Sequence, residues 1–498
     1  MLPKGQFTWL DWAVVTITLL GMLAIGYHSA KGNKTQKDYI LGGRVLNSNL
    51  VGFSLFATLF STLSYLSYPG EMIKYGPLFC AGLLSFPVAY WVVGKFLIPK
   101  FVSMNVTSAY EILEIKLGKG SRGLASIFFL SLRYLWMSTI IYATVDIALV
   151  PILGLDERIV PLMSIILVLI TVLYTSMGGL KAVVLTDFMQ SMIMFLGVVL
   201  TIGIIAFKVG DLHEFLNPSY RAHWLKWDFM PRIHFRMTAF NIFIMNGMWQ
   251  IMTAGSDQMA IQRYLSVRDV KAAKHSYAVS LTSSGVIQLL LALVGFMVLV
   301  FFSKYPEYLG EASIAENADQ LFPLFITVGL PSGITGIIAA ALIAAAMSSL
   351  SGGLNSCSAV IQEDILKKMK KFKNKEFGLS SIKKISAVLG IIVALSCFLI
   401  GYVQGNLLDV VIKVVNLVVA PLFVLFFMAL FVPSATDAGT VIGGLAAFAV
   451  AILIAFFGIF DITAIWTMPF SFLSGARVGY ICSKVERVAK NKNDEKNL

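Results

Sequence analysis

The sequence predicts an all-α polytopic membrane protein, and three observations support this fold class. Hydrophobic residues make up 57% of the 498 positions, and charged residues make up only 13%. Many windows exceed the ~20 predominantly apolar residues that a helix needs to cross the hydrocarbon core of a bilayer. The basic residues gather in short segments between these windows, which is typical of cytoplasmic loops. The net charge of +12 is therefore no indication of nucleic-acid binding.

We expect about thirteen transmembrane helices in a single domain at 1–482, followed by a cytoplasmic tail at 483–498. The first span, near 9–29, has no cleavage-like site after it and is too long for the apolar region of a signal peptide, so we expect it to be retained. The other spans are expected near 46–75, 77–99, 123–152, 159–177, 181–207, 238–256, 276–303, 331–362, 382–403, 407–432, 438–458 and 463–482.

The basic clusters between the spans predict the orientation of the chain. With the expected helix count they all fall on one side, and basic loops are typically cytoplasmic. We therefore expect the N-terminus outside, the C-terminus in the cytoplasm, and the protein in the plasma (inner) membrane. The clusters are Lys116/Lys119/Arg122, Arg263/Arg268/Lys271/Lys274, the Lys367–Lys384 run and the tail from Lys484.

No motif in the sequence predicts an enzyme or a bound cofactor. The four cysteines lie in or beside apolar segments without metal-type spacing, so they predict neither a disulfide framework nor a zinc site. The sequence contains no recognisable catalytic nucleophile, metal-ligand cluster or phosphate-binding loop. We expect the cysteines to act as packing residues.

The segment Ala339–Ile365 is apolar enough to cross a bilayer and carries three serines in its middle. Ser348 and Ser351 are three residues apart and so share one face of a helix, while Ala345 lies one turn before Ser349. Hydroxyl and carbonyl oxygens suit a hard cation such as sodium, and they avoid the cost of several fixed charges inside a membrane. Alternatively, the small residues of this segment only allow neighbouring helices to pack closely.

The second span is irregular, because FATLFSTLSYLSYPGEMIKYG places serines, threonines, Pro69 and Gly70 at membrane depth. Proline and glycine interrupt a helix and free backbone carbonyls, which a membrane protein tolerates where those carbonyls line a cavity. We therefore predict a helix break at Pro69 and Gly70. A simple proline kink is the alternative.

Ionisable residues within the spans are candidates for functional positions, because each costs on the order of 2.5 to 3.5 kcal/mol in lipid by insertion scales. Asp187 follows a glycine-containing turn, and its carboxylate is a candidate to neutralise a second cation on the serine helix. Arg133 is either a solute contact or part of a structural ion pair. Asp257 is expected near the cytoplasmic end of its helix, in contact with water.

Six separated motifs cover most of the chain: DYILGGR (38–44), FATLFSTLSYLSYPGE, SAYEILEIKLG (108–118), YTSMGGLKAVVLTDFMQ, GSDQMAIQRYLS (255–266) and AAAMSSLSGGLNS (344–356). In this order they resemble the sodium:solute symporter family, which includes sodium-coupled sugar, proline, sialic acid, iodide, vitamin and monocarboxylate carriers. The resemblance implies the inverted-repeat fold of the leucine transporter, with five helices in about 46–207, five more in about 238–432, and extra helices at the ends. It also implies sodium-driven symport by alternating access.

The same resemblance implies which residues bind sodium. The main sodium site of the family uses two carbonyls of the broken helix, here Ala57 and Phe60, together with one carbonyl and two hydroxyls of the serine helix. Those three positions are Ala345, Ser348 and Ser349. Sialic acid carriers add a second sodium ion, whose ligands would be Asp187, Ser348, Ser349 and Ser351 here.

The solute is less constrained by the resemblance. Ser61 and Ser64 match positions that bind sialic acid in its carriers, whereas the aligned Leu59, Leu83 and Trp136 lack polar groups. The runs SxLSxxxxPxE and DQMAIQRY resemble the iodide, vitamin and monocarboxylate branch, which favours a small organic anion. A sugar, a polyol or a sialic-acid-type solute is the alternative. The candidate solute contacts are Ser61, Ser64, Tyr65, Arg133, Asn246, Trp249 and Gln250.

The expected partners are sodium as the coupling ion, a small-molecule solute and membrane lipid, and the oligomeric state is left open. Two other classes stay open at this point. One is a sodium-independent or proton-coupled exchanger on the same fold. The other is a transporter-like membrane sensor, for which we expect a signalling domain that the short segment after Cys482 does not supply.

Overall fold

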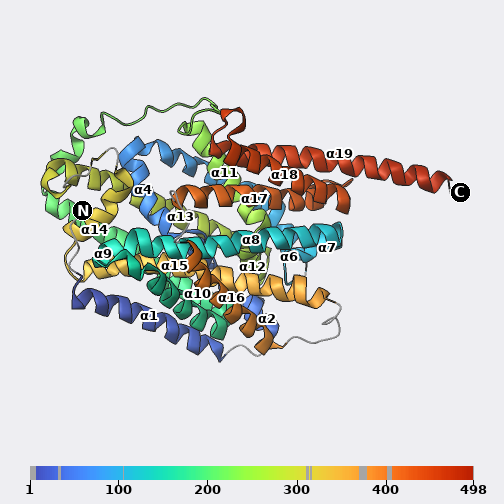
Figure 1. The fold of residues 1–498 in the computed structure, drawn as a ribbon, viewed down its shortest axis with the longest axis horizontal. Coiled ribbons are helices and arrows are strands. Elements are labelled where there is room, and N and C mark those ends of the chain that lie inside the picture. The colour runs from blue at the N-terminus through green and yellow to red at the C-terminus, as the bar shows by residue number, and fades with distance from the viewer. Residues whose placement is uncertain are drawn as a thin grey trace.

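The computed structural model describes residues 7–31, 35–104, 106–309, 313–314, 317–369, 378–400 and 407–496. Within these ranges the chain forms helices and connecting segments and no β-strand. Figure 1 shows the long helices lying roughly side by side along the longest axis of the molecule, with α19 (Thr467–Lys496) projecting beyond the others. Residues 370–377 of the predicted basic run lie outside the described ranges.

The helices differ strongly in length. Eight helical segments of the described chain are long and apolar enough to cross a membrane. The count of eight segments does not confirm the predicted count of about thirteen spans, because several expected spans are divided into short helices or merged into one. The long helices are α1 (Trp9–Ala30), α8 (Lys119–Ala143), α10 (Val160–Val209), α13 (Val270–Lys304), α15 (Ile334–Val360), α16 (Leu379–Ile400), α17 (Leu407–Phe431), α18 (Asp437–Phe457) and α19.

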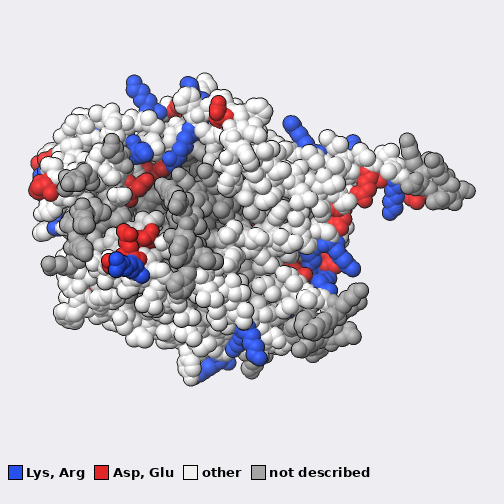
Figure 2. Space-filling model, viewed as in Figure 1, with Lys and Arg blue, Asp and Glu red and all other residues white. Residues whose placement is uncertain are grey.

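Shorter helices complete the bundle. The expected span 46–75 is interrupted and forms α3 (Ser48–Leu59) and α4 (Thr62–Tyr75). The expected span 238–256 is the continuous helix α11 (Ala239–Ser256), and α12 (Gln258–Leu265) follows it directly after Asp257. The remaining helices are α2 (Gln36–Leu41), α5 (Phe86–Val92), α6 (Ile98–Ser103), α7 (Glu111–Lys116), α9 (Val150–Leu153) and α14 (Ala318–Gly329). In Figure 2, residues other than Lys, Arg, Asp and Glu cover much of the described surface of this face.

Helix α10 contains two of the predicted spans, 159–177 and 181–207, and they meet at Gly179. This residue has φ 60° and ψ −156°, a backbone conformation that glycine adopts without a steric penalty. A Cβ atom at this position would lie 2.6 Å from the carbonyl oxygen of Tyr39 in α2. The absence of a side chain therefore permits both the change of chain direction and the contact with α2.

The break in the second span lies elsewhere than the sequence predicted. The helix stops at Phe60, and Pro69 and Gly70 are both within α4. Both residues lie at close contacts between helices instead. A Cβ atom added to Gly70 would lie 2.3 Å from Asp319 of α14. The Pro69 carbonyl packs against Gly295 of α13, where an added Cβ atom would lie 2.4 Å from its oxygen. The prediction of a break at Pro69 and Gly70 was therefore wrong in position.

Two of the predicted surface arginines are buried. Arg122 is 7% exposed and forms ion pairs with Asp364 and Glu114, and it donates to the carbonyl of Glu363 at 3.0 Å. Arg263 is fully buried in α12. The sequence could not separate these arginines from their solvated basic neighbours, because the buried carboxylates Asp364 and Asp187 that pair with them lie 242 and 76 positions away along the chain.

The N-terminal helix α1 is attached to α15 through a buried carboxylate. Asp11 is 0% exposed, and its Oδ1 accepts hydrogen bonds of 2.7 Å from the backbone amides of both Gly333 and Gly336. These amides belong to the first turn of α15, where helical N–H groups have no partner within the helix and a negative charge is favourable. Asp11 therefore caps the helix that carries the three serines.

We expect the Asp11→Ala substitution to lower the thermal unfolding midpoint of the purified protein by a few degrees. The change removes the partner of the buried Gly336 amide, which costs about 1–3 kcal/mol, and of the partly buried Gly333 amide. The measurement is a thermal unfolding scan in detergent. The control is Asp156→Ala, which removes another helix-capping carboxylate that is 72% exposed, and an equal decrease in this control would contradict the assigned role.

Candidate functional site

The break between α3 and α4 leaves backbone carbonyls without helical partners. The amide of Phe60 makes the last helical bond of α3, to Phe56 at 2.9 Å, and Phe60 itself has the extended angles φ −101° and ψ 106°. Ser61 then begins α4 as its N-cap, with its hydroxyl accepting from the amide of Ser64 at 3.3 Å. The carbonyls at the end of α3 must therefore find partners outside their own helix.

Serine hydroxyls of α15 meet these carbonyls. Ser348 Oγ lies 2.8 Å from the carbonyl oxygen of Ala57 and 3.0 Å from that of Ala345. Ser349 Oγ donates to the carbonyl of Thr58 at 3.1 Å. Both serines are at most 1% exposed. A cluster of neutral oxygens is thus formed between the broken helix and the serine helix.

Four of the five residues predicted for the main sodium site make these contacts, and the sequence missed the carbonyl of Thr58. The fifth, Phe60, lies at the helix break, and its side chain lines the cavity described below. The described part of the chain contains no group of three or more His, Cys, Asp or Glu side chains suited to a metal ion. A cation held at this break would therefore depend on neutral oxygens.

Asp187 of α10 lies in a fully buried polar cluster with α3 and α12. Its Oδ2 accepts from the Ser54 hydroxyl at 2.6 Å, from the Thr58 hydroxyl at 3.1 Å and from Arg263 Nη2 at 3.1 Å. Its Oδ1 has no hydrogen-bond partner among the described residues. Ser351, the other residue predicted only for the second ion, donates to the carbonyl of Ser348 at 3.1 Å.

The pairing of Asp187 with Arg263 was missed by sequence reasoning, which assigned Arg263 to a cytoplasmic basic loop. Arg263 also donates to Ser54 Oγ at 2.9 Å, to the hydroxyl of Thr58 and to the carbonyl of Met259 at 2.9 Å. Charge balance was the available signal, since a carboxylate predicted at membrane depth needs a cation nearby.

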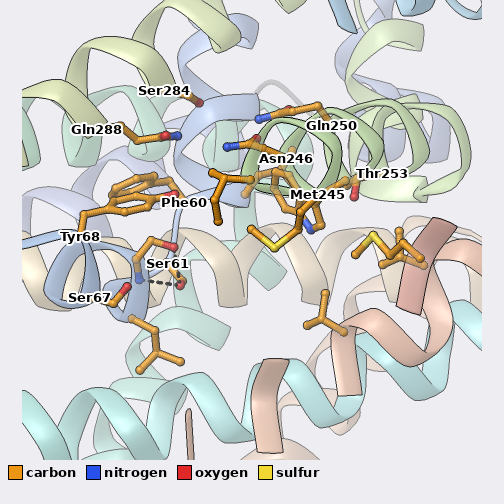
Figure 3. A pocket seen from close by; sticks show the side chains of 18 of the residues that line it. Phe60, Ser61, Ser67, Tyr68, Met245, Asn246, Gln250, Thr253, Ser284 and Gln288 are labelled. Atoms are coloured by element: carbon orange, nitrogen blue, oxygen red, sulfur yellow. Dashed lines mark hydrogen bonds between the residues drawn. The ribbon is translucent and has the colours of Figure 1, made fainter. Parts of the chain in front are cut away.

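A cavity of about 600 Å³ lies beside the break. Thr58 and Phe60 contribute to its wall, so it adjoins the oxygen cluster. In Figure 3 the side chains of Asn246 and Gln250 reach it from α11, and Ser61 reaches it from the start of α4. Its other predicted wall residues are Ser64, Arg133 and Trp249.

The structure adds polar residues that the sequence did not single out. Ser280, Ser284 and Gln288 of α13 line the cavity at intervals of four residues, and Figure 3 shows the last two near Gln250. Residues four apart share one face of a helix. This spacing inside the predicted span 276–303 was a signal that could have identified them.

Tyr65 does not contribute to the cavity wall, contrary to the prediction. Its ring is 0% exposed and stacks on Phe322 with 6.2 Å between the ring centroids, and its hydroxyl donates to the carbonyl of Met194 at 3.2 Å. Tyr65 follows Ser64 along α4, and adjacent residues of a helix point in different directions. Tyr65 therefore packs α4 against its neighbours.

Asp257 is buried rather than solvated, which corrects the expectation from the sequence. It is 2% exposed, lies at the break between α11 and α12 with φ −82° and ψ 127°, and accepts from the amide of Met259 at 2.8 Å. Its other oxygen forms an ion pair with Arg133 of α8. A carboxylate at this interrupted helix caps α12 and also neutralises the buried arginine.

The family model described as the sodium:solute symporter family matches residues 39–447. The chain belongs to this family. The sodium/sialic acid symporter SiaT of Proteus mirabilis (strain HI4320) is 30% identical to this symporter over 464 residues, covering 91% of this chain and 90% of the relative. The sodium-coupled monocarboxylate transporter 1 of Xenopus laevis is 29% identical over 458 residues, covering 90% of this chain and 72% of the relative. These relatives are sodium-coupled transporters and not enzymes.

Solved structures confirm the fold class of this symporter. A substrate-bound, outward-open Na⁺-coupled sialic acid symporter superposes with a TM-score of 0.83 at 26% identity, over 96% of this chain and 98% of that chain. A nucleobase-cation-symport-1 family transporter in a closed conformation superposes with a TM-score of 0.60 at 13% identity, over 92% of this chain and 96% of that chain, and this likeness concerns the fold alone.

We expect Ser348→Ala and Ser349→Ala each to abolish the stabilisation of the purified symporter by sodium. Each change removes one hydroxyl from the oxygen cluster while leaving the helix intact. The measurement is the thermal unfolding midpoint in sodium chloride and in choline chloride.

The matched control for these two variants is Ser358→Ala, because Ser358 is equally buried in α15. Among the described residues its hydroxyl bonds only to the carbonyl of Leu354 in the same helix. Sodium should stabilise this control as it does the parent. An undiminished sodium effect in both Ser348→Ala and Ser349→Ala would refute the site.

Proposed function

We propose that this symporter imports a small polar organic solute, with an organic anion as the first candidate, by coupling it to the entry of sodium through alternating access. The proposal rests above all on one observation: the hydroxyls of Ser348 and Ser349 meet the carbonyls of an interrupted helix directly beside a cavity of about 600 Å³. Coupling requires the bound ion and the bound solute to favour the same conformation of the protein. The broken helix can link them, because it contributes both to the oxygen cluster and to the cavity wall.

Sodium would bind to the oxygens of Ala57, Phe60, Ala345, Ser348 and Ser349. The two serine hydroxyls would turn their protons away from the carbonyls, so that hydroxyl and carbonyl oxygens face the ion together. Neutral ligands suit this depth, because a site built from several carboxylates would be costly to bury. The bound ion would join α3 to α15.

This link gives sodium a way to drive transport. An ion that binds more tightly when α3 and α15 are close shifts the population towards conformations in which the solute site is complete. The inward movement of each sodium ion also releases about 2.3 kcal/mol of free energy per 100 mV of inside-negative membrane potential. The energy of the sodium gradient and of the potential would thus support uptake against a solute gradient.

We propose a second sodium ion on Asp187, Ser348, Ser349 and Ser351. Oδ1 of Asp187 supports this assignment, because it has no hydrogen-bond partner in the part of the chain that the structure describes, and a buried carboxylate oxygen without a partner is a strong ligand for a cation. Arg263 already balances the charge of Asp187 through Oδ2. The second ion would therefore bind more weakly than at an isolated carboxylate.

Among solutes, a small organic anion is the first candidate, because Arg133 and Arg236 bring guanidinium groups to the cavity wall. Each of these arginines is also paired with a carboxylate, Arg133 with Asp257 and Arg236 with Glu71. A neutral sugar or polyol is the second candidate, favoured by amide side chains such as Asn246, Gln250 and Gln288 in the same wall. The Proteus mirabilis relative is named for sialic acid. The apolar side chains of Leu59 and Trp136 in this wall favour a solute other than sialic acid.

We further propose that 1–482 form one transmembrane domain with repeats at about 46–207 and 238–432, followed by a tail at 483–498. The protein would lie in the plasma (inner) membrane with its N-terminus outside and its C-terminus inside. This orientation is supported by the basic residues that are exposed to solvent, because exposed basic loops are typically cytoplasmic. The side chain of Arg268, for example, is 80% exposed.

Reconstituted protein should accumulate labelled solute only with an inward sodium gradient. The experiment uses proteoliposomes and a panel of carboxylates, sugars and polyols, with choline replacing all external sodium in a parallel series. We expect uptake in sodium to be abolished in choline and to increase with an inside-negative potential. Undiminished uptake in choline would contradict sodium coupling and indicate a sodium-independent exchanger.

The number of ions can be tested with Ser351→Ala. We expect the parent to show a sigmoidal dependence of uptake on sodium concentration and the variant to show a hyperbolic one. The Hill coefficient of the sodium dependence cannot exceed the number of sodium ions that bind cooperatively. Ser358→Ala is again the control, and it should stay sigmoidal. A hyperbolic curve in the parent would argue against a second coupled ion.

A further inference from the structure

The cavity beside the helix break has charged residues at the place where it meets solvent. Among the described residues, three charged side chains line its wall: Arg133, which is 7% exposed, Glu71, which is 22% exposed, and Arg236, which is 54% exposed. Arg236 Nη2 donates to Glu71 Oε1 at 2.7 Å. The cavity therefore has a deep end near Arg133 and a mouth at which Glu71 and Arg236 form an ion pair.

Glu71 lies on the face of α4 that lines the cavity. Ser64, Ser67 and Glu71 contribute to the wall at intervals of three and four residues, and Figure 3 shows Ser67 beside the cavity. An α-helix rises about 1.5 Å per residue, so Glu71 is about 10 Å further from the helix break than Ser64. A single helix thus extends from the break to the mouth.

The mouth and the solvated Arg268 lie at opposite ends of the broken helix. The amide of Leu46, just before α3, donates to the carbonyl of Ser266 at 3.1 Å, which places the basic segment around Arg268 at the start of α3. Glu71 lies near the end of α4, on the other side of the break. With the proposed orientation, the mouth therefore faces the outside of the membrane.

Arg236 belongs to the segment before α11, and hydrogen bonds hold this segment in place. The side-chain amide of Asn241 in α11 donates to the carbonyls of Arg232 and Phe235, at 2.7 and 2.6 Å. The guanidinium of Arg236 also lies over the ring of Tyr75, with 5.7 Å between Cζ and the ring centroid. Arg236 therefore connects a fixed segment to two successive turns at the end of α4.

The exposure of this ion pair suits a contact that breaks and re-forms during transport. Partly exposed ion pairs are only weakly stabilising, because water competes for both partners. Separating the buried pair of Arg133 and Asp257 would instead leave uncompensated charges away from water, which is strongly destabilising. Glu71 and Arg236 can separate at the mouth because water can solvate both groups there.

We propose that Glu71 and Arg236 are positioning residues that form a gate at the mouth of the solute cavity. When they are paired, they hold the end of α4 against the segment before α11 and hinder the passage of the solute. When they are apart, the mouth is wider and admits the solute. This inference rests on the proposed function, because it takes the cavity as the solute site.

The test measures access to the cavity in the purified full-length protein and needs no known solute. A cysteine is introduced by Ser67→Cys, one turn inside the mouth, and its rate of modification by a negatively charged methanethiosulfonate reagent is measured. The protein without this change gives the background from the native cysteines. We expect Glu71→Gln and Arg236→Gln each to increase the rate about fivefold, and Arg236→Lys to stay within about twofold of the parent.

The two glutamine variants together separate gating from simple attraction of the reagent. Removing a negative charge at Glu71 and removing a positive charge at Arg236 would change the electrostatic attraction of an anionic reagent in opposite directions. A gate predicts an increase in both variants. Rates that are unchanged, or that change in opposite directions, would overturn the inference, as would an Arg236→Lys variant that reacts as fast as Arg236→Gln.

The matched control is Arg232→Gln. Arg232 lies in the same segment, its side chain is 50% exposed, and it pairs with Asp228 at 2.8 Å, but neither residue contributes to the cavity wall. An equal increase in this control would assign the effect to loosening of the segment and overturn the inference. Failure of sodium coupling is seen separately, as uptake that persists in choline.

Discussion

The arrangement of this protein depends on one constraint: backbone carbonyls freed inside a membrane must have partners. At the end of α3 the partners are serine hydroxyls of α15, at 2.8 Å for Ala57 and 3.1 Å for Thr58. Because lipid offers no hydrogen bonds, these contacts hold the two helices together at mid-span. The proposed sodium site would use the same oxygens that satisfy each other in this way.

Buried charges follow the same logic of pairing. Asp187 is balanced by Arg263 and Asp257 by Arg133, and each pair connects helices that are far apart in the sequence. Removing one member would leave an uncompensated charge, which is strongly destabilising. These two pairs therefore add no net charge to the interior of the bundle.

The part of the candidate site on α15 could be predicted from the sequence, because Ala345, Ser348 and Ser349 lie within about one turn of one apolar segment. Ala57 on the broken helix, 291 positions from Ser348, came only from the family motifs. Other features could not be predicted. Pro69 resembles a helix breaker, yet it stays within α4, since packing against Gly295 accommodates it. Tyr65 resembles a cavity residue, yet its side chain points towards the carbonyl of Met194.

The sequence by itself determined the membrane class, the helical fold and the serine-bearing helix, because hydrophobic length and short-range spacing are local properties of the chain. Only the tertiary structure decided which buried charges pair, where the broken helix opens and which side chains of α13 face the cavity. Arg263 shows the reason: its neighbours along the chain suggest a cytoplasmic loop, whereas its partner Asp187 lies 76 positions away. Contacts between distant segments depend on how whole helices pack, and no local pattern encodes them.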